Sequence, residues 1–486
     1  MIFNNKELGF FNSIDSVSEQ LQVIDSMISK YKINEKELID FINKELCRNF
    51  ENKNYEQVLQ YFRISYKIKG ILPWKCYAYT RLSARNLFSK KPNEAYNYWL
   101  SCSSDQALTA YDISNNIFQK SDTKDNICKK YSKLLTQIVG KEWIKYYSNA
   151  FDIILNSIFN PLADSINCEL HNFRAIVVSG MGWSGSSAVY DYLREFSSIY
   201  PVLGGELSII EEKESFLGLT YIIDNWDKNL DVIDELVTKW AIEFFFINLL
   251  GCYPIIRDDV YKQILFYRKF NIKDPFKYAE GVIQISSILS NLIIYAKKRD
   301  LLSVNKTAKL LATAILNIAT IDAPNNKIPL LDNAIHFRNL QLIKYFDSVD
   351  LICVERDPRS IFVSQLEERA DFDNNIVAFT NSQIANRELL SQKKESLDEN
   401  SAKRCSFIKF EDFVLSSNFR SNLVEKLELD SKTWTERNKF FIPENSSKNV
   451  INFLNDVHTK EIQYIYENMK EYCLDYLNET TKPDDN

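Results

Sequence analysis

Two segments of the chain share one pattern, in which a short apolar run gives way to small or charged residues and then to helical spacing. The first begins at Ala175-Ile-Val-Val178, passes through a Gly/Ser-rich turn and resumes with apolar residues up to Leu193. The second begins at Val349-Asp-Leu-Ile-Cys-Val354 and continues into a helix with Pro358 in its first turn. Apolar runs of this length are typical of strands covered on both faces of a parallel sheet. Each segment therefore predicts a strand, a turn and a helix.

Most of the remaining chain shows helical spacing. Residues 1–165 contain few glycines and repeated apolar positions, which predicts a separate helical domain, either a bundle or a helical-repeat module. Residues from about 210 to 320 predict a helical insertion, with the strongest helices at Asn229–Phe246 and Thr307–Ala319. The chain is therefore predicted to be an α/β protein, with a central parallel sheet within residues 166–486 and an all-helical domain before it.

The turn of the first segment is suited to binding an anion. Gly180, Gly182 and Gly185 allow the backbone to approach a ligand, and hydroxyl groups come from Ser184, Ser186 and Ser187. A helix that starts directly after such a turn also presents free backbone N–H groups. A nucleotide kinase is disfavoured because the turn lacks a Lys-Ser or Lys-Thr pair, and its GxGxxG spacing is only a weak dinucleotide signal. Taken alone, the turn is also compatible with packing and chain reversal.

The turn of the second segment carries charge. Arg356 follows the strand, and Ser364 lies eight residues later, about two helical turns on, so both can converge on one phosphate at the sheet edge. An isolated Arg-Asp-Pro-Arg turn is equally compatible with ordinary ion pairing at the start of a helix. Two strand-turn-helix units of this kind in one chain favour a nucleotide site over packing alone.

Together the two turns resemble the sulfotransferase family, over roughly residues 170–470. The resemblance implies a P-loop-like three-layer fold and 3′-phosphoadenylyl sulfate (PAPS) as the sulfuryl donor. It implies that the loop Gly182-Trp183-Ser184-Gly185-Ser186-Ser187 binds the 5′-phosphosulfate, and that Arg356 and Ser364 bind the 3′-phosphate. Phe407–Phe413 is similar to the strand and turn that follow the 3′-phosphate motif, and Pro443–Asn449, which includes Lys448, is similar to a late loop that closes over the nucleotide.

Trp183 departs from the family pattern. Many relatives carry Lys or Arg directly before the Ser-Gly pair of the first loop, where the cation stabilises the bridging oxygen of the leaving phosphate. A cation from elsewhere is therefore expected, and the candidates are Lys327, Arg338, Lys409 and Lys448.

Sulfuryl transfer to a hydroxyl group requires a base for the acceptor proton. Glu206, after the apparent strand that begins at Tyr200, is the first candidate, because carbohydrate-directed sulfotransferases often use a Glu near this place. It could instead cap a helix starting near Ser208. Asp332 and His336 are the alternatives, since Lys327–His336 predicts an inner strand that ends in polar groups.

Composition narrows the class of protein. A net charge of −6 argues against binding to bulk nucleic acid. Nine scattered cysteines without a C-x-x-C pair suit reduced thiols, and three histidines form no metal-binding spacing, so no metal is expected. The start of the chain lacks a signal-peptide pattern, and the apolar window Ala241–Ile256 is too short to cross a membrane. A cytoplasmic protein is expected, or one peripheral to the inner face of a membrane.

The leading hypothesis is a PAPS-dependent sulfotransferase acting on a hydroxyl group of a carbohydrate or lipid-linked glycan. The helical N-terminal domain is a candidate for binding a protein partner. One alternative is a P-loop phosphotransferase that uses ATP or GTP, and another is a non-catalytic helical scaffold with a decayed nucleotide fold.

Overall fold

The structure is a computed structural model that describes residues 35–67, 123–138, 143–160, 163–168, 174–202, 210, 215–250, 273–368 and 375–474. The chain divides into two compact units. The first comprises Met1–Gly140 with Leu250–Leu265, and the second comprises Lys141–Leu249 with Phe266–Asn486. Every predicted site residue falls in the second unit.

The described residues of the first unit are mostly helical. Its helices are α3 (Glu35–Glu51), α4 (Tyr55–Lys67) and α8 (Lys124–Ile138). The helices α3 and α4 pack against each other, because both place apolar side chains at helical spacing on one face. The buried side chains of this pair include Leu38, Ile42, Leu46, Val58 and Tyr61.

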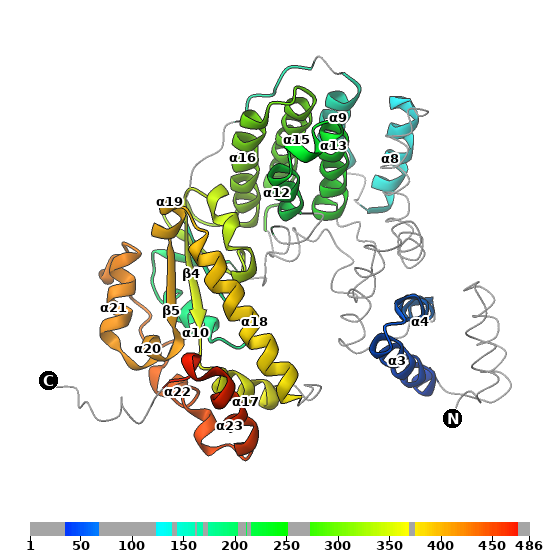
Figure 1. Cartoon of the computed structure of the whole chain (residues 1–486). Helices are drawn as coiled ribbons and strands as arrows, with labels where there is room; N and C mark the ends of the chain where they lie inside the picture. The colour runs from blue at the N-terminus through cyan, green and yellow to red at the C-terminus, as the bar shows by residue number, and fades with distance from the viewer. Residues whose placement is uncertain are drawn as a thin grey trace, which may run out of the picture. The chain divides into compact units, whose positions relative to one another are not determined.

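The second unit contains a helical layer and a sheet. The helices of the layer are α9 (Ile144–Phe159), α12 (Phe216–Asp224), α13 (Ile233–Phe244), α15 (Pro275–Lys297) and α16 (Leu301–Ala319). Helix α15 packs against α9, α13 and α16, and is the centre of the layer (Figure 1). The predicted helix Thr307–Ala319 forms the larger part of α16, and most of Asn229–Phe246 forms α13.

Helix α15 shows how the layer is tied together. The Asp274 carboxylate accepts the N–H groups of Phe276 and Lys277 at its start, and Lys297 near its end donates to two carbonyl oxygens of α9. By length and composition, its segment Phe276–Lys297 could cross a membrane, but 72% of the apolar window is buried inside the protein, as in a core helix. Helix α9 lies within the domain predicted for residues 1–165, yet it packs here against α15.

The sheet has five parallel strands in the order β2-β3-β1-β4-β5. The strands are β1 (Ala175–Gly180), β2 (Ile199–Pro201), β3 (Ile328–Asp332), β4 (Val349–Glu355) and β5 (Cys405–Lys409). The predicted strands at Ala175 and Val349 are confirmed and lie side by side at the centre of the sheet. Because all strands run the same way, every strand-to-helix turn leaves the same edge, which we call the carboxyl edge.

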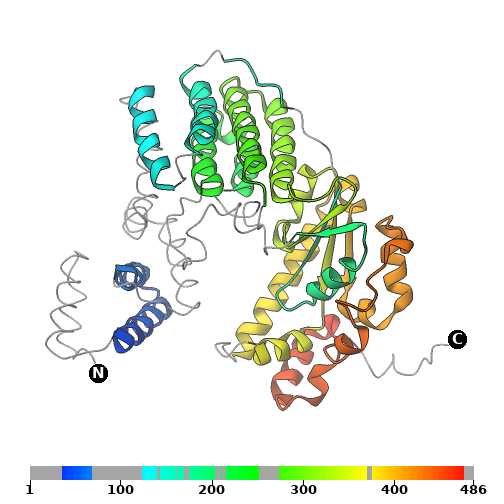
Figure 2. The ribbon, with the colours of Figure 1, turned by 180° about the vertical axis from the view of Figure 1, so that it is seen from behind.

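Helices cover both faces of the sheet, which confirms the predicted α/β class. On one face, α10 (Ser186–Leu193), α20 (Phe410–Leu415) and α21 (Ser417–Lys426) form an apolar core with the strands. On the other, α18 (Ile376–Glu395) runs along the sheet, and Lys394 Nζ lies 4.6 Å from the ring centroid of Phe407. Figure 2 shows α10 from the side opposite to Figure 1. This three-layer arrangement leaves the carboxyl edge as the place for a ligand.

Candidate functional site

The turn between β1 and α10, residues Met181–Gly185, is here called the first loop, and glycine is required at two places around it. A Cβ on Gly180 would lie 2.1 Å from Ser184 Oγ, and one on Gly185 would lie 2.2 Å from the Phe410 ring. Gly185 also has φ +84°, a left-handed conformation that glycine adopts without strain. The Ser184 N–H donates to the Met181 carbonyl at 2.9 Å and closes the loop. The chain is thus folded tightly against itself directly before α10 begins.

This geometry leaves donors for an anion. Helix α10 starts at Ser186, so the N–H groups of Ser186 and Ser187 have no partner within the helix, whereas the Ala188 N–H donates to the Gly185 carbonyl at 3.0 Å. Gly182 and Ser187 are exposed residues. Ser184 is only 1% exposed, and its Oγ has no hydrogen-bond partner among the residues that the structure describes. A buried hydroxyl group of this kind beside a helix N-terminus fits a phosphate or sulfate oxygen.

Trp183 holds the first loop in place by its packing and its backbone. Its φ is +61°, and its half-buried indole packs against an apolar cluster that includes Phe362, Phe379 and Phe453. The side chain therefore faces the helices after β4, while its carbonyl oxygen accepts a hydrogen bond from Arg356 Nη1 at 3.0 Å. The residue that replaces the expected cation in the first loop anchors that loop to the second turn.

Arg356 links three segments that are distant in the sequence. Besides the Trp183 carbonyl, its guanidinium donates to the carbonyl oxygen of Asn449 and lies 4.9 Å from the ring centroid of Phe410. Its side chain is 6% exposed. The second turn therefore contacts the first loop, and Lys448, exposed at the end of α22 (Pro443–Ser447), adjoins Asn449 in the sequence.

The turn after Arg356 is held by a buried ion pair. Both oxygens of the Asp357 carboxylate accept from the Arg359 guanidinium, at 3.0 and 2.7 Å, and one also accepts the Leu474 N–H at 2.9 Å. The Asp357 N–H donates to Glu411 Oε1 at 2.8 Å. Burial raises the pKa of Glu411 to about 7. The Arg-Asp-Pro-Arg sequence thus divides into one arginine that pairs with Asp357 and one that reaches the first loop.

Ser364 lies two turns into α17 (Pro358–Glu368) and is 7% exposed. Its Oγ accepts a hydrogen bond from Asn452 Nδ2 at 3.2 Å. The backbone that contacts Arg356, at Asn449, is only three residues before Asn452. Both predicted 3′-phosphate residues, Arg356 and Ser364, therefore contact one segment late in the chain, residues 449–452, which we call the late segment.

The candidate bases lie on the opposite side of β1. Asp332 ends β3 and is paired in register with Val178 of β1. Tyr190 of α10 donates from its Oη to the Val202 carbonyl at 3.2 Å, and its pKa is raised by burial and next by the Asp332 carboxylate. Burial lowers the pKa of His336 to about 4, with a further contribution from Arg338, so its imidazole is neutral near pH 7. Glu206 lies outside the described residues.

The candidates for the cation that Trp183 does not provide lie at different edges of the sheet. Lys327 directly precedes β3, so it lies at the amino edge of the sheet, opposite to the first loop. Arg338 follows β3 and Lys409 is the last residue of β5, so both lie on the side of the carboxyl edge. Arg338 donates to Asn386 Oδ1 at 3.1 Å, and Lys409 is exposed. The parallel topology thus removes Lys327 from the possible partners of an anion at the first loop.

Sequence reasoning missed a buried cation at this site, Arg387 of α18. Its Nη2 donates to the Arg356 carbonyl at 2.6 Å, and its Nη1 lies 3.6 Å from Met181 Sδ in the first loop. Arg387 stands in a helix with no turn motif nearby, so no local signal marks it. Only the packing of α18 onto the sheet brings it to the carboxyl edge.

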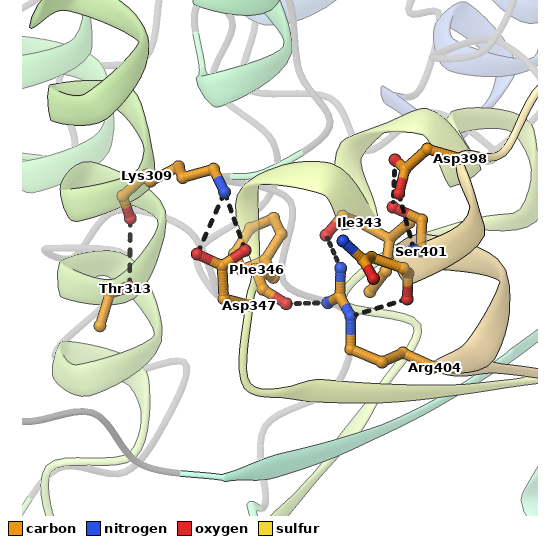
Figure 3. Close-up of polar contacts among 9 residues, drawn as sticks. Lys309, Thr313, Ile343, Phe346, Asp347, Asp398, Ser401 and Arg404 are labelled. Carbon is orange, nitrogen blue, oxygen red and sulfur yellow. Dashed lines mark hydrogen bonds and ion pairs between the residues drawn. The ribbon is translucent and has the colours of Figure 1, made fainter.

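A cavity of about 450 Å³ lies at the other edge of the sheet. Its lining includes Lys306, Lys309, Asp347 and Arg404; Asp347 lies two residues before β4, and Arg404 lies directly before β5. In Figure 3, Arg404 points at the backbone oxygens of Ile343 and Phe346, and Lys309 pairs with Asp347 at 2.9 Å. These groups are satisfied by the protein itself, and ligands of parallel sheets bind at the carboxyl ends of the strands. The first loop therefore remains the candidate site.

Within the described ranges, no group of three or more His, Cys, Asp or Glu residues is placed to hold a metal ion. No protein-family model matches the sequence, and no curated protein matches it significantly. The structure is similar to that of the sulfotransferase STF1 from Mycobacterium tuberculosis H37Rv, with 11% sequence identity and a TM-score of 0.26, over 72% of this chain and 93% of the other. At that TM-score the similarity carries no functional argument, so the function of this chain is inferred from its own loop and turns.

Proposed function

We propose that this protein transfers a sulfuryl group from PAPS to a hydroxyl group of a carbohydrate acceptor. The observation that carries the proposal is the bridge made by Arg356, which joins the second turn to the first loop and to the late segment at Asn449. A donor with two separate phosphate positions requires two anion sites held at a fixed distance, and a bond that ties the first loop to the second turn supports such a donor.

The residues at the carboxyl edge fit such a donor. The buried Ser184 Oγ and the N–H groups at the start of α10 suit the phosphosulfate, and Arg356 with Ser364 suits the 3′-phosphate. When bound, PAPS supplies an activated sulfuryl group, whose sulfur–oxygen bond to the phosphate breaks as the acceptor oxygen attaches. The loop N–H groups then face the charge that develops on the leaving phosphate.

The acceptor hydroxyl group must lose its proton as it attacks. Asp332 and His336 stand at the end of β3, beside β1, on the side away from Arg356. The carboxylate of Asp332 can accept that proton, and Glu206 stays a third candidate. The neutral imidazole of His336 can accept it only at Nδ1, which in this structure accepts the Arg338 N–H at 3.4 Å. An acceptor bound beside the end of β3 would then place its hydroxyl group between these bases and a phosphosulfate at the first loop.

A ligand-binding experiment separates this proposal from its alternatives. Stabilisation of the full chain against thermal unfolding is measured with 3′,5′-adenosine bisphosphate and, separately, with ADP or GDP. We expect the bisphosphate to raise the unfolding midpoint and the diphosphates to leave it nearly unchanged. A response to the diphosphates alone would indicate a phosphotransferase, and a response to none would indicate a non-catalytic scaffold.

Transfer itself is tested with radiolabelled PAPS and a panel of mono- and oligosaccharides. Label in the sugar fraction, lost with Asp332→Asn or His336→Gln but with bisphosphate binding retained, would identify the base. Binding of the bisphosphate without transfer to any carbohydrate would move the acceptor to another class of hydroxyl compound.

A further inference from the structure

Arg387 is a buried cation without a carboxylate partner among the residues that the structure describes. It is 4% exposed, and its guanidinium donates to Gln383 Oε1 at 2.5 Å and to the Arg356 carbonyl at 2.6 Å. Its remaining contacts are Met181 Sδ at 3.6 Å and the face of Tyr472, 5.3 Å from the ring centroid. All of these partners are neutral. Arg359, in the neighbouring turn, is also buried but forms an ion pair with Asp357 at 2.7 Å.

A buried guanidinium without a counter-charge is costly. Arginine stays protonated in proteins, so it cannot avoid the cost by losing its proton. Hydrogen bonds to carbonyl groups satisfy its donors but leave its charge uncompensated. Burial lowers the pKa of Arg387, and the carboxylates of Glu355 and Asp357 oppose this only from a distance. The position therefore has a positive potential that a nearby anion would relieve.

The contacts of Arg387 place that potential at the first loop. Met181 is the first residue of the loop, and the Arg356 carbonyl belongs to the turn whose side chain reaches Trp183. We propose that Arg387 is a positioning residue of the anion site, which fixes the Arg356 turn against the first loop and stabilises the bound anion by its charge. It would supply, from α18, the cation that Trp183 does not provide. The inference rests on the proposed function only in naming the phosphosulfate as the anion.

The test compares two arginines held by carbonyl groups at opposite edges of the sheet. Arg387→Met removes the charge while keeping an extended side chain, and Arg387→Lys keeps the charge. Arg404→Met is the matched control, because Arg404 donates to the carbonyl oxygens of Ile343, Phe346 and Asn400 at the amino edge. Calorimetric titration of each full-length variant uses 3′,5′-adenosine bisphosphate, ADP and pyrophosphate, and the unfolding midpoint is recorded without ligand.

We expect Arg387→Met to bind the bisphosphate about tenfold or more weakly, and Arg387→Lys to recover part of the loss. The ligand-free midpoint of Arg387→Met should stay near that of the wild type or rise, because a buried unpaired charge has been removed. Arg404→Met should bind as the wild type does, whatever its stability. If Arg387→Met does not fold, Arg387→Lys decides, with weaker binding than wild type expected because a point charge cannot reproduce the guanidinium contacts.

Unchanged bisphosphate affinity in Arg387→Met, or equal weakening in Arg404→Met, would overturn the inference. If the wild-type protein binds pyrophosphate or ADP but not the bisphosphate, PAPS is rejected as the donor. The role of Arg387 is still supported in that case if Arg387→Met weakens the binding of pyrophosphate or ADP. Binding of none of the three anions by the wild type would overturn both proposals.

Discussion

Single residues of the first loop have separable tasks. Gly185 allows the chain to pass Phe410 in a left-handed conformation, Ser184 buries a hydroxyl group, and Trp183 anchors the loop through its indole and carbonyl groups. Gly182, directly before Trp183, has no atom within 4 Å of the position of a Cβ. The two glycines therefore differ in what they permit, although they look alike in the sequence.

Replacing Gly185 with alanine should lower the free energy of unfolding by about 2–4 kcal/mol. The new Cβ would overlap the Phe410 ring, and the positive φ is strained for any residue with a side chain. Gly182→Ala is the control and should change stability by less than about 0.5 kcal/mol. Urea denaturation of both variants provides the measurement, and equal losses would show that the loop can rearrange around the added methyl group.

Arg356→Ala should weaken binding of 3′,5′-adenosine bisphosphate by about 1.5–3 kcal/mol, because a charge-assisted contact is lost. The variant also loses hydrogen bonds to the carbonyl groups of Trp183 and Asn449, so titrations are run well below its unfolding midpoint. Lys327→Ala, at the opposite edge of the sheet, serves as the control for general charge effects. Wild-type affinity in Arg356→Ala would remove this residue from the binding site.

At the scale of elements, one carboxylate organises the segment that follows α21. Glu195, directly after α10, is fully buried and accepts the indole N–H of Trp434 at 2.9 Å. It also accepts the backbone N–H groups of Asn438, Phe440 and Phe441, at 3.2, 2.9 and 2.9 Å. A carboxylate is required because all four partners donate, and it ties this segment to the end of α10, the helix that follows the first loop.

Glu195→Gln should destabilise the protein by about 2–4 kcal/mol and loosen residues 434–441. The amide NH₂ group would face donors in place of an acceptor oxygen, which leaves buried N–H groups unpaired. Hydrogen exchange measured by mass spectrometry should therefore rise in this segment. Asp191→Asn, on the same helix and half-exposed, is the control and should leave exchange in the segment unchanged. Wild-type protection in Glu195→Gln would mean that other contacts hold the segment.

For the whole molecule, two buried groups give opposing pH dependences of stability. The pKa of Glu411 rises from 4.5 to about 7 on folding, so its contribution is present at low pH and is lost as the pH rises through about 7. The pKa of His336 falls from 6.5 to about 4, so its contribution is present above 6.5 and is lost as the pH falls toward 4. Glu411 thus lowers stability as the pH rises above neutrality, and His336 lowers it as the pH falls below neutrality.

Glu411→Gln should gain stability relative to the wild type at pH 8, by about 1–3 kcal/mol, and little at pH 5. The amide keeps an oxygen that can accept the Asp357 N–H but no longer pays for a buried charge at high pH. Unfolding free energies at several pH values between 5 and 8 test this, with the exposed Glu425→Gln as the control. A constant difference between Glu411→Gln and wild type across that range would contradict the raised pKa.

Local sequence determines the strands, turns and helices that form the candidate anion site. The apolar runs at Ala175 and Val349 predict strands because burial on both faces requires them, and the Gly/Ser turn and Pro358 mark where each helix starts. Parallel strands also bring their carboxyl ends to one edge, so Asp332 and Arg356 could be expected near the first loop. These features depend on neighbouring residues, whose spacing the sequence displays directly.

The tertiary structure alone decided which of these groups touch. The bond from Arg356 to the Trp183 carbonyl, the cover of Asn452 over Ser364 and the position of Arg387 beside Met181 join residues that are 85 or more positions apart. The parallel pairing of β3 with β1 also places Lys327, directly before β3, at the edge opposite to the candidate anion site. Such contacts arise from packing of helices onto a sheet, and no periodicity within a helix such as α18 indicates which of its buried side chains will meet a distant loop.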